Sequence, residues 1–309
     1  MTELQLTKDV ALTASPSILY NNLSCLGDSY AYAHQTDVYL VRPLGPHKVP
    51  LKEKDRATIT SVTTAHSRGR GLLILTSNAE TQIWDAQKEV QLSVVSHGPE
   101  SETRGVGVVE MADRLFLAIG HGTGEVEFVE LGPDFGANIL KRQKAHRGGI
   151  TAIGTCGARQ TSQCCVVSGD TSGELQFWNS QFTAYGSAAA QNDCVTSVVV
   201  FNEFVAAGYG SGTIRLFLAD SAQLRVDIGA HSRWINAISY DPFTARLATI
   251  AEDNLLCVWK MPTGESPKVE FLAHKVHANR LPTGVAWTPD GKSVVVALYD
   301  TDKLLVYTP

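Results

Sequence analysis

The sequence lacks a long apolar run. No segment approaches the roughly 18 apolar residues that a membrane-spanning helix needs, and the first residues, MTELQLTKDVALT, carry acids where a signal peptide carries bases. The six cysteines include no Cys-x-x-Cys pair, so the ligand spacing of a zinc ribbon is missing. We therefore expect a cytoplasmic chain with reduced thiols, no metal, no cofactor and no membrane partner.

The sequence also lacks an excess of positive charge. Its formal net charge is −5 and its pI is about 6.0, which disfavours nucleic acid as a partner. Apolar residues make up 44% of the chain, enough for a packed interior. At 309 residues the chain exceeds the roughly 250–300 residues at which a single core stops growing. It should therefore form two domains or an array of repeats.

The most regular stretch runs from Ala230 to Lys260. Three runs within it, Trp234–Tyr240, Leu247–Ala251 and Leu255–Trp259, alternate apolar and polar residues. Two turns containing Asp, Pro and Asn separate these runs. Alternation with a period of two is typical of half-buried β-strands. The stretch therefore predicts a small antiparallel sheet.

Four polar residues mark this stretch: His231, Thr249, Asp253 and Trp259, with the spacing His-x17-Thr-x3-Asp-x5-Trp. The pattern resembles the WD-repeat (WD40) β-propeller family. That resemblance implies a chain of hydrogen bonds from the Trp indole to the Thr hydroxyl, from the hydroxyl to His and from His to Asp. A fully satisfied buried network of this kind rigidifies the unit that contains it.

The position of Trp259 recurs along the whole chain, in steps of 39 to 49 residues. The matching residues are Val41, Trp84, Val129, Trp178, Phe217 and Tyr307. A period of about 40–45 residues with four short strands per unit is typical of a propeller. In the fourth unit, His146, Ser168 and Trp178 occupy network positions and Ser172 stands where Asp is expected. The sequence therefore predicts an all-β, seven-bladed propeller in a single domain.

Closure of the ring is expected from the first residues of the chain. The last unit supplies only three strands, while Leu4–Leu12 reads as a strand without a hairpin partner. Pairing the two would remove the open edges of the sheet. We assign residues 1–16 to the closing strand, and the blades to about 17–52, 57–95, 104–131, 146–185, 194–228, 231–272 and 283–309. The run Ala206–Phe217 further resembles one subgroup of the WD-repeat family.

Two motifs invite a catalytic interpretation that the repeat disfavours. Gly208–Gly212 and Gly120–Gly124 resemble phosphate-binding loops, but no helix follows either of them, so we interpret both as hairpin turns. Histidines precede the first strand of several blades and could suggest acid–base chemistry. They recur once per blade, as His97, His146, His231 and His274, which favours a structural role. His121 and His277 lie outside this pattern and have no assigned role.

One arrangement points to binding. The segments that enter the first strands carry arginines in five blades, and in a propeller these segments share one face. The predicted rim consists of Arg56, Arg104, Arg147, Tyr209, Arg233, Trp234, Arg280 and Tyr299. Arginine with exposed Trp and Tyr is the composition of binding hot spots. The alternative is a solvated rim whose arginines pair with nearby acids such as Asp170, Glu252, Asp300 and Asp302.

We expect a non-catalytic scaffold, a monomeric ring that binds other proteins within an intracellular or signalling complex. Its partners would carry acidic or phosphorylated segments that the rim arginines bind in bidentate fashion. The alternatives are a small-ligand or phosphopeptide receptor at the channel mouth, or a component of a cytoskeletal or ciliary assembly. An enzyme would need several titratable groups to converge on one pocket.

Overall fold

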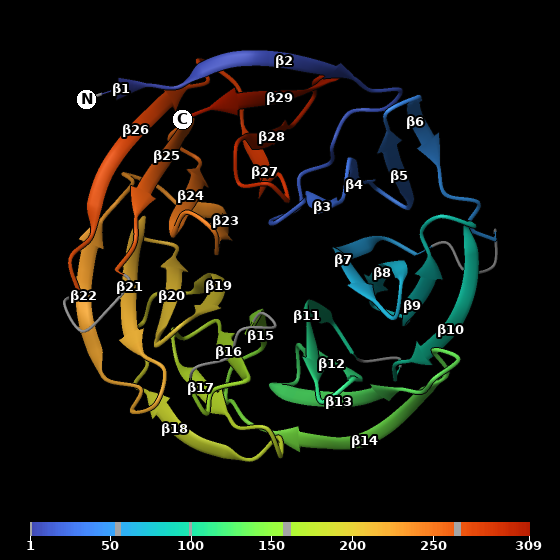
Figure 1. The fold of residues 1–309 in the computed structure, drawn as a ribbon. Coiled ribbons are helices and arrows are strands. Elements are labelled where there is room, and N and C mark those ends of the chain that lie inside the picture. Colours follow the sequence, from blue (N-terminus) through green and yellow to red (C-terminus); the bar gives the residue numbers. More distant parts are fainter. Residues whose placement is uncertain (1, 53–56, 99–100, 157–161, 263–266) are drawn as a thin grey trace.

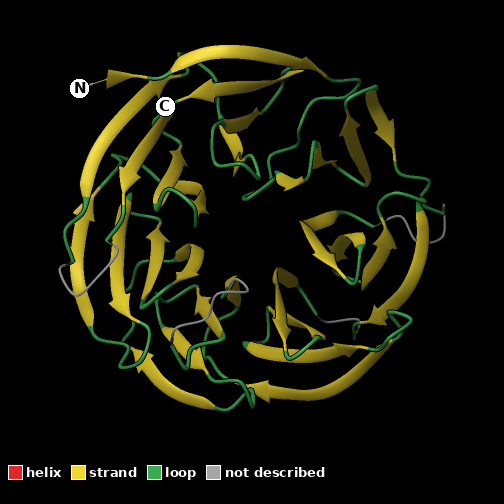
Figure 2. Ribbon diagram, in the orientation of Figure 1, coloured by secondary structure: helices red, strands yellow, loops and turns green. Residues whose placement is uncertain are grey.

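Seven β-sheets form a closed ring around a central channel in this computed structural model (Figure 1). The structure describes residues 2–52, 57–98, 101–156, 162–262 and 267–309. Within these ranges the chain consists of strands, turns and loops, and no helix is present (Figure 2). Accordingly, the described residues include no helix that could cross a membrane. The predicted seven-bladed propeller is confirmed.

Each sheet, or blade, is an antiparallel meander that starts at the channel and ends at the outside of the ring (Figure 1). The first three blades contain β3 (Ser24–Leu26), β4 (Ser29–His34), β5 (Asp37–Arg42) and β6 (Gly45–Lys48); β7 (Ile59–Ser67), β8 (Arg70–Ser77), β9 (Glu80–Asp85) and β10 (Val90–Ser96); and β11 (Thr103–Met111), β12 (Arg114–His121), β13 (Glu125–Leu131) and β14 (Ala137–Lys144). The fourth and fifth contain β15 (Ile150–Thr155), β16 (Val166–Asp170), β17 (Leu175–Trp178) and β18 (Ala184–Ala188); and β19 (Val195–Phe201), β20 (Phe204–Tyr209), β21 (Thr213–Leu218) and β22 (Leu224–Gly229). The last two contain β23 (Ile235–Asp241), β24 (Arg246–Ala251), β25 (Leu255–Lys260) and β26 (Glu270–Val276); and β27 (Pro282–Trp287), β28 (Val294–Leu298) and β29 (Lys303–Thr308).

The apolar core lies between neighbouring blades rather than at the centre of the ring. Middle strands such as β28, with the sequence VVVAL, are buried on both faces because a blade covers each side. The outer strand β14, with the sequence ANILKRQK, is mostly exposed. At the boundary of the third and fourth blades, the rings of Phe128 and Trp178 meet edge to face with centroids 5.2 Å apart. Each blade is therefore stabilised mainly by its two neighbours.

The N-terminal segment closes the ring. Strand β2 (Gln5–Ala11) pairs antiparallel with β29, from Gln5 opposite Thr308 to Ala11 opposite Lys303 (Figure 1). The two-residue strand β1 (Thr2–Glu3) pairs in parallel with β26 of the sixth blade. Between them, Leu4 is 2% exposed and packs in the core shared by the sixth and seventh blades. The segment thus joins two blades, whereas the sequence predicted contact with the last blade alone.

Three expected blade boundaries are too short, among them that of the fourth blade, which was expected to end at residue 185 and continues in β18 to Ala188. The third blade was expected to end at residue 131, and its outer strand β14 extends it to Lys144. The sixth was expected to end at residue 272, and β26 continues to Val276. In both of these outer strands, β14 and β26, the apolar residues stand next to each other, as in Ile139-Leu140 and Phe271-Leu272-Ala273, so they lack the apolar alternation on which the prediction depended.

Candidate functional site

The segments that enter the innermost strands and the turns between the second and third strands share one face of the ring. Backbone hydrogen bonds join the two in successive blades, and they run from Thr171 to Gly149, Gly210 to Cys194, Glu252 to Trp234 and Tyr299 to Leu281, at 2.8–3.0 Å. Most inner strands also have a register shift at this entry, as between Ile235 and Ala237. Such bulges bend a strand and redirect its first side chains.

Four of the predicted rim arginines are exposed on this face. They are Arg104, Arg147, Arg233 and Arg280. Within the described ranges none of them makes an ion pair; the arginines that do are Arg42, Arg70, Arg114, Arg142 and Arg215. Arg56 lies outside the described residues. Asp170, which was named as a possible partner of these arginines, is fully buried and faces His146 instead. These four guanidinium groups therefore keep their donors available.

Trp234 lies at the mouth of the channel. Its ring stacks on Tyr20, with centroids 5.6 Å apart, and its indole Nε1 has no hydrogen-bond partner among the described residues. Both rings and Arg104 line a cavity of about 640 Å³ in the channel. A Cβ atom on Gly210 would lie only 2.7 Å from the Trp234 ring, so this position needs glycine. The glycine-rich run around it forms the β20–β21 hairpin turn, as expected.

The prediction that Tyr209 flanks the rim is wrong. Tyr209 is the last residue of β20, pairs with Val195 and is only 1% exposed. Its ring lies beneath the Arg215 guanidinium, 4.5 Å from the centroid, and burial raises the pKa of Tyr209 to about 12. Its side chain points between the blades because it belongs to the strand rather than to the turn. Tyr299, in contrast, is 42% exposed and lines a second hollow with Arg280.

The sixth blade contains the hydrogen-bond chain that the WD-repeat resemblance implied. Trp259 Nε1 donates to Thr249 Oγ1 at 3.1 Å, and this hydroxyl contacts His231 Nε2 at 2.8 Å. His231 Nδ1 lies 3.1 Å from the Asp253 carboxylate. Burial alone would raise the pKa of Asp253, but its bonds to His231 and to backbone amides hold that pKa below the usual range.

The fourth blade has the same network with a different acid. His146 Nε2 and Trp178 Nε1 both contact Ser168 Oγ, at 2.7 and 3.1 Å. The carboxylate is that of Asp170, 3.5 Å from His146 Nδ1, and not Ser172, which donates to Asp170. Ser172 does occupy the turn position of Asp253, since Thr171 bonds to Gly149 as Glu252 bonds to Trp234, and the acid of this network comes instead from the end of β16. In the second blade, Trp84 Nε1 donates to Gln82 Oε1 at 2.8 Å.

Between the sixth and seventh blades, His277, and not His274, stands at the position that His231 holds before the sixth blade. Its backbone amide bonds to Asn254 O, as that of His231 bonds to Gly212 O, and its Nε2 lies 3.0 Å from Tyr307 Oη. His274 is a residue of β26 that pairs with Cys257. Tyr307 stands at the position that tryptophan holds in other blades. His277 is thus a structural histidine.

Acid should destabilise the ring through His277. Burial lowers the pKa of His277 from 6.5 to about 4. Because the folded-state pKa is depressed, protons bind the unfolded chain first, and stability is lost as the pH falls from about 6.5 towards 4, by up to roughly 3 kcal/mol. Urea unfolding at pH 7 and pH 4.5 should show this loss in the natural chain and less of it in His277→Asn. An equal loss in His277→Asn would contradict the assignment, and the exposed His66→Asn is the control.

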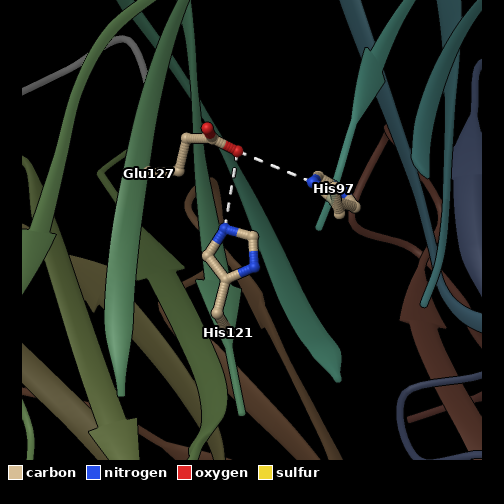
Figure 3. A group of neighbouring side chains, drawn as sticks. All are labelled: His97, His121 and Glu127. Atoms are coloured by element: carbon tan, nitrogen blue, oxygen red, sulfur yellow. Dashed lines mark ion pairs between the residues drawn. The ribbon is translucent and has the colours of Figure 1, made fainter. Parts of the chain in front are cut away.

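A third buried polar cluster has no counterpart in the predictions. His97, His121 and Glu127 meet at the boundary of the second and third blades, with the imidazole nitrogens 3.6 and 3.4 Å from one carboxylate oxygen (Figure 3). Their ligand atoms all lie within 4.8 Å of one another. The three residues come from three segments whose spacing matches no metal motif, so no pattern in the sequence identifies them together.

Comparison with known proteins identifies the family. The family model of WDR54 matches residues 43–305. The chain belongs to the WDR54 family. It is 27% identical to WD repeat domain 54 of Rattus norvegicus and 28% identical to WD repeat-containing protein 54 of Mus musculus, over 96% of this chain and 97% of each relative. It is also 28% identical to the Homo sapiens protein of that name over 82% of this chain and 83% of the relative. The subgroup likeness based on Ala206–Phe217, which was to WD repeat-containing protein 54, is confirmed.

A solved structure supports the fold. A chain of the "Crystal Structure of Mitotic Checkpoint Complex" superposes with a TM-score of 0.79 and 14% identity, over 100% of this chain and 93% of that one. At this identity the likeness shows the propeller fold alone. WD-repeat propellers generally serve as protein-interaction scaffolds and are typically not catalytic.

Proposed function

We propose that this WDR54-family propeller is a non-catalytic interaction platform whose arginine rim binds acidic or phosphorylated segments of partner proteins. The arginine rim is here the set Arg104, Arg147, Arg233, Arg280, Trp234 and Tyr299. The observation that carries the proposal is that its four arginines are exposed and make no ion pair with any described carboxylate. If acids of the same chain already paired with these arginines, few guanidinium groups would remain to bind a partner.

The chemistry of the rim fits an anionic segment better than an apolar one. Arginine binds carboxylate or phosphate with two parallel hydrogen bonds, which are stronger than neutral ones. Trp234 adds a half-buried aromatic surface next to Arg233. Charged donors around an aromatic anchor are typical of binding hot spots. We further propose that the ring works as a monomer within a larger complex in the cytoplasm, where its six cysteines fit a reducing compartment.

A small anionic ligand is the second candidate. The channel cavity of about 640 Å³ beneath Trp234 and Arg104 has the size of a small-ligand site. A ligand there would contact Arg104 and leave Arg147 and Arg233 unused, since the latter two do not line the cavity. Substitutions at these positions therefore distinguish the two candidates.

Replacing Arg147, Arg233 and Trp234 together with alanine should abolish partner capture and leave thermal stability nearly unchanged. Binding of a phosphopeptide and an acidic peptide library would be measured by fluorescence polarisation, with pull-downs from native cells beside it. The control variant replaces Arg68, Arg114 and the exposed Phe243 with alanine. Arg114 pairs with Glu130 and Arg68 donates to Gly132 O, so neither arginine belongs to the rim. Binding that survives in the triple variant would refute the rim. A loss confined to Arg104→Ala would favour the small-ligand reading.

A further inference from the structure

Three buried side chains aim atoms without hydrogen-bond partners at one point. The side chains of His97, His121 and Glu127 are 0–1% exposed. Among the described residues, no hydrogen-bond partner reaches His97 Nδ1, His121 Nε2 or Glu127 Oε2. Figure 3 shows both imidazole rings pointing at the same carboxylate oxygen. A buried polar atom without a partner is costly, so three at one place call for a ligand.

The distances between these atoms suit a shared metal ion. The separations of 3.6 Å from His97 Nδ1 and 3.4 Å from His121 Nε2 to Glu127 Oε2 are long for hydrogen bonds. Two ligands about 2.0–2.1 Å from a tetrahedral zinc ion lie about 3.3 Å from each other. Two of the three separations are thus close to that value, and the two imidazole nitrogens lie within 4.8 Å of each other, so side-chain shifts can bring all three atoms into the first coordination sphere.

The remaining atoms of the three side chains are already held. His97 Nε2 lies 2.9 Å from Thr81 Oγ1, and His121 Nδ1 lies 2.5 Å from Ser101 Oγ. Arg142 Nη2 donates to Glu127 Oε1 at 3.0 Å. Ligating histidines usually bond through the second nitrogen, which fixes the tautomer and leaves the first nitrogen unprotonated. These contacts thus orient the groups as a metal site requires.

The carboxylate is prepared for a cation as well. Glu127 Oε2 faces both imidazole nitrogens and has no hydrogen-bond partner among the described residues. Arg142 uses the other carboxylate oxygen, and its side chain is 36% exposed, so water screens its charge.

The cluster replaces the ordinary blade network at the same positions. Glu127 pairs with Ile119 as Gln176 pairs with Ser168 in the fourth blade, so His121 stands where Asp170 stands. His97 bonds to the preceding blade turn through its amide, as His146 does. The third blade thus has Ile119 in place of the network hydroxyl and His121 in place of the network acid, and Glu127 stands where Gln176 lies outside the network. These replacements bring a second imidazole and a carboxylate next to His97.

We propose that His97, His121 and Glu127 bind one zinc ion that links the second and third blades. Two imidazoles and one carboxylate, with water completing the shell, form a known zinc coordination set. His97 follows β10 and bonds to Thr81 of the second blade, whereas His121 and Glu127 belong to the third. The ion would therefore fasten two neighbouring sheets, and its binding would be independent of the arginine rim.

Metal analysis tests the site directly. The full chain, stripped with a chelator and dialysed, should take up about one equivalent of zinc in a calorimetric titration and melt at a higher temperature with zinc present. Cobalt in place of zinc should give the visible absorption of a four-coordinate site. Glu127→Gln, which can still accept from Arg142, and His121→Ala should lose the tight uptake and the thermal shift. The exposed His66→Ala should keep both.

Two results would overturn the proposal. The first is that the natural chain shows no saturable zinc uptake at micromolar zinc. This result does not depend on whether the variants fold. The second is equal uptake by Glu127→Gln and the natural chain, which would mark the zinc as adventitious. Either result would leave the cluster as a charged histidine–carboxylate network.

Discussion

Deleting residues 2–11 should open the ring and lower the free energy of unfolding by several kcal/mol. The deletion removes a ladder of six residue pairs between β2 and β29, with each net hydrogen bond contributing about 0.5–1.5 kcal/mol. It also removes Leu4 from the core of the sixth and seventh blades and exposes the edge of β29. Urea unfolding followed by tryptophan fluorescence would measure the loss, and light scattering would report association through the open edge.

Two controls separate closure from a general effect of the terminus. Asp9→Asn removes only the exposed ion pair of Asp9 with Lys303 and should leave stability nearly unchanged. A synthetic peptide of residues 2–12, added to the deleted chain, should restore much of the stability by filling the vacant strand position. A deleted chain as stable as the full one would show that the segment does not close the ring.

Replacing Trp178 with alanine should cost about 3–5 kcal/mol, the usual range for a large buried aromatic side chain. Trp178 is 0% exposed, donates to Ser168 and packs edge to face against Phe128 of the third blade. The substitution therefore removes a contact within the fourth blade and one across its boundary. Chemical unfolding would measure the loss, and the whole ring should unfold in one transition because each blade depends on its neighbours.

Trp178→Phe separates the two contributions. Phenylalanine keeps most of the packing and loses the indole donor, so it should cost roughly 1–3 kcal/mol, less than alanine. Equal losses of unfolding free energy for the two variants would show that the hydrogen bond, and not the packing against Phe128, provides the stabilisation. A loss below about 1 kcal/mol for alanine would contradict the buried role of this side chain.

Local patterns in the sequence were enough to predict the ring. Alternation over short runs, the period marked by Trp84, Trp178 and Trp259, and the unpaired strand at Leu4–Leu12 together indicated seven sheets and their closure. These features depend on residues close in sequence, or on a repeat, and both are visible without coordinates. The network of His231, Thr249, Asp253 and Trp259 could be found because its residues and their spacing resemble the WD-repeat pattern.

The misplaced residues depend on register. His274 was expected where His277 stands, a shift of three residues next to a turn, and Asp170, two residues before the turn position of Ser172, was not expected to supply the acid of the fourth blade. Tyr209 was expected to be exposed because it was assigned to the turn, and it is the final residue of a strand. Turn lengths and bulges decide such positions, and they follow from packing rather than from local composition.

The histidine–carboxylate cluster could not have been found by pattern alone. Its members lie in the loop after β10, at the end of β12 and within β13, and they converge only once the second and third blades are packed. His121 was noticed in the sequence as a histidine outside the blade pattern, and that irregularity was the one available sign. Departures from a repeat are thus as informative as the repeat itself.

Residue-level hydrogen exchange in β29 tests the closed ring most directly. From Leu304 to Tyr307 the strand is paired on both sides, so its amides face a partner strand, whereas an edge strand leaves every second amide open to water. We predict slow exchange at every amide from Leu304 to Tyr307 in the full chain. Alternating fast and slow amides there would show an unpaired edge and contradict closure by the N-terminal strand.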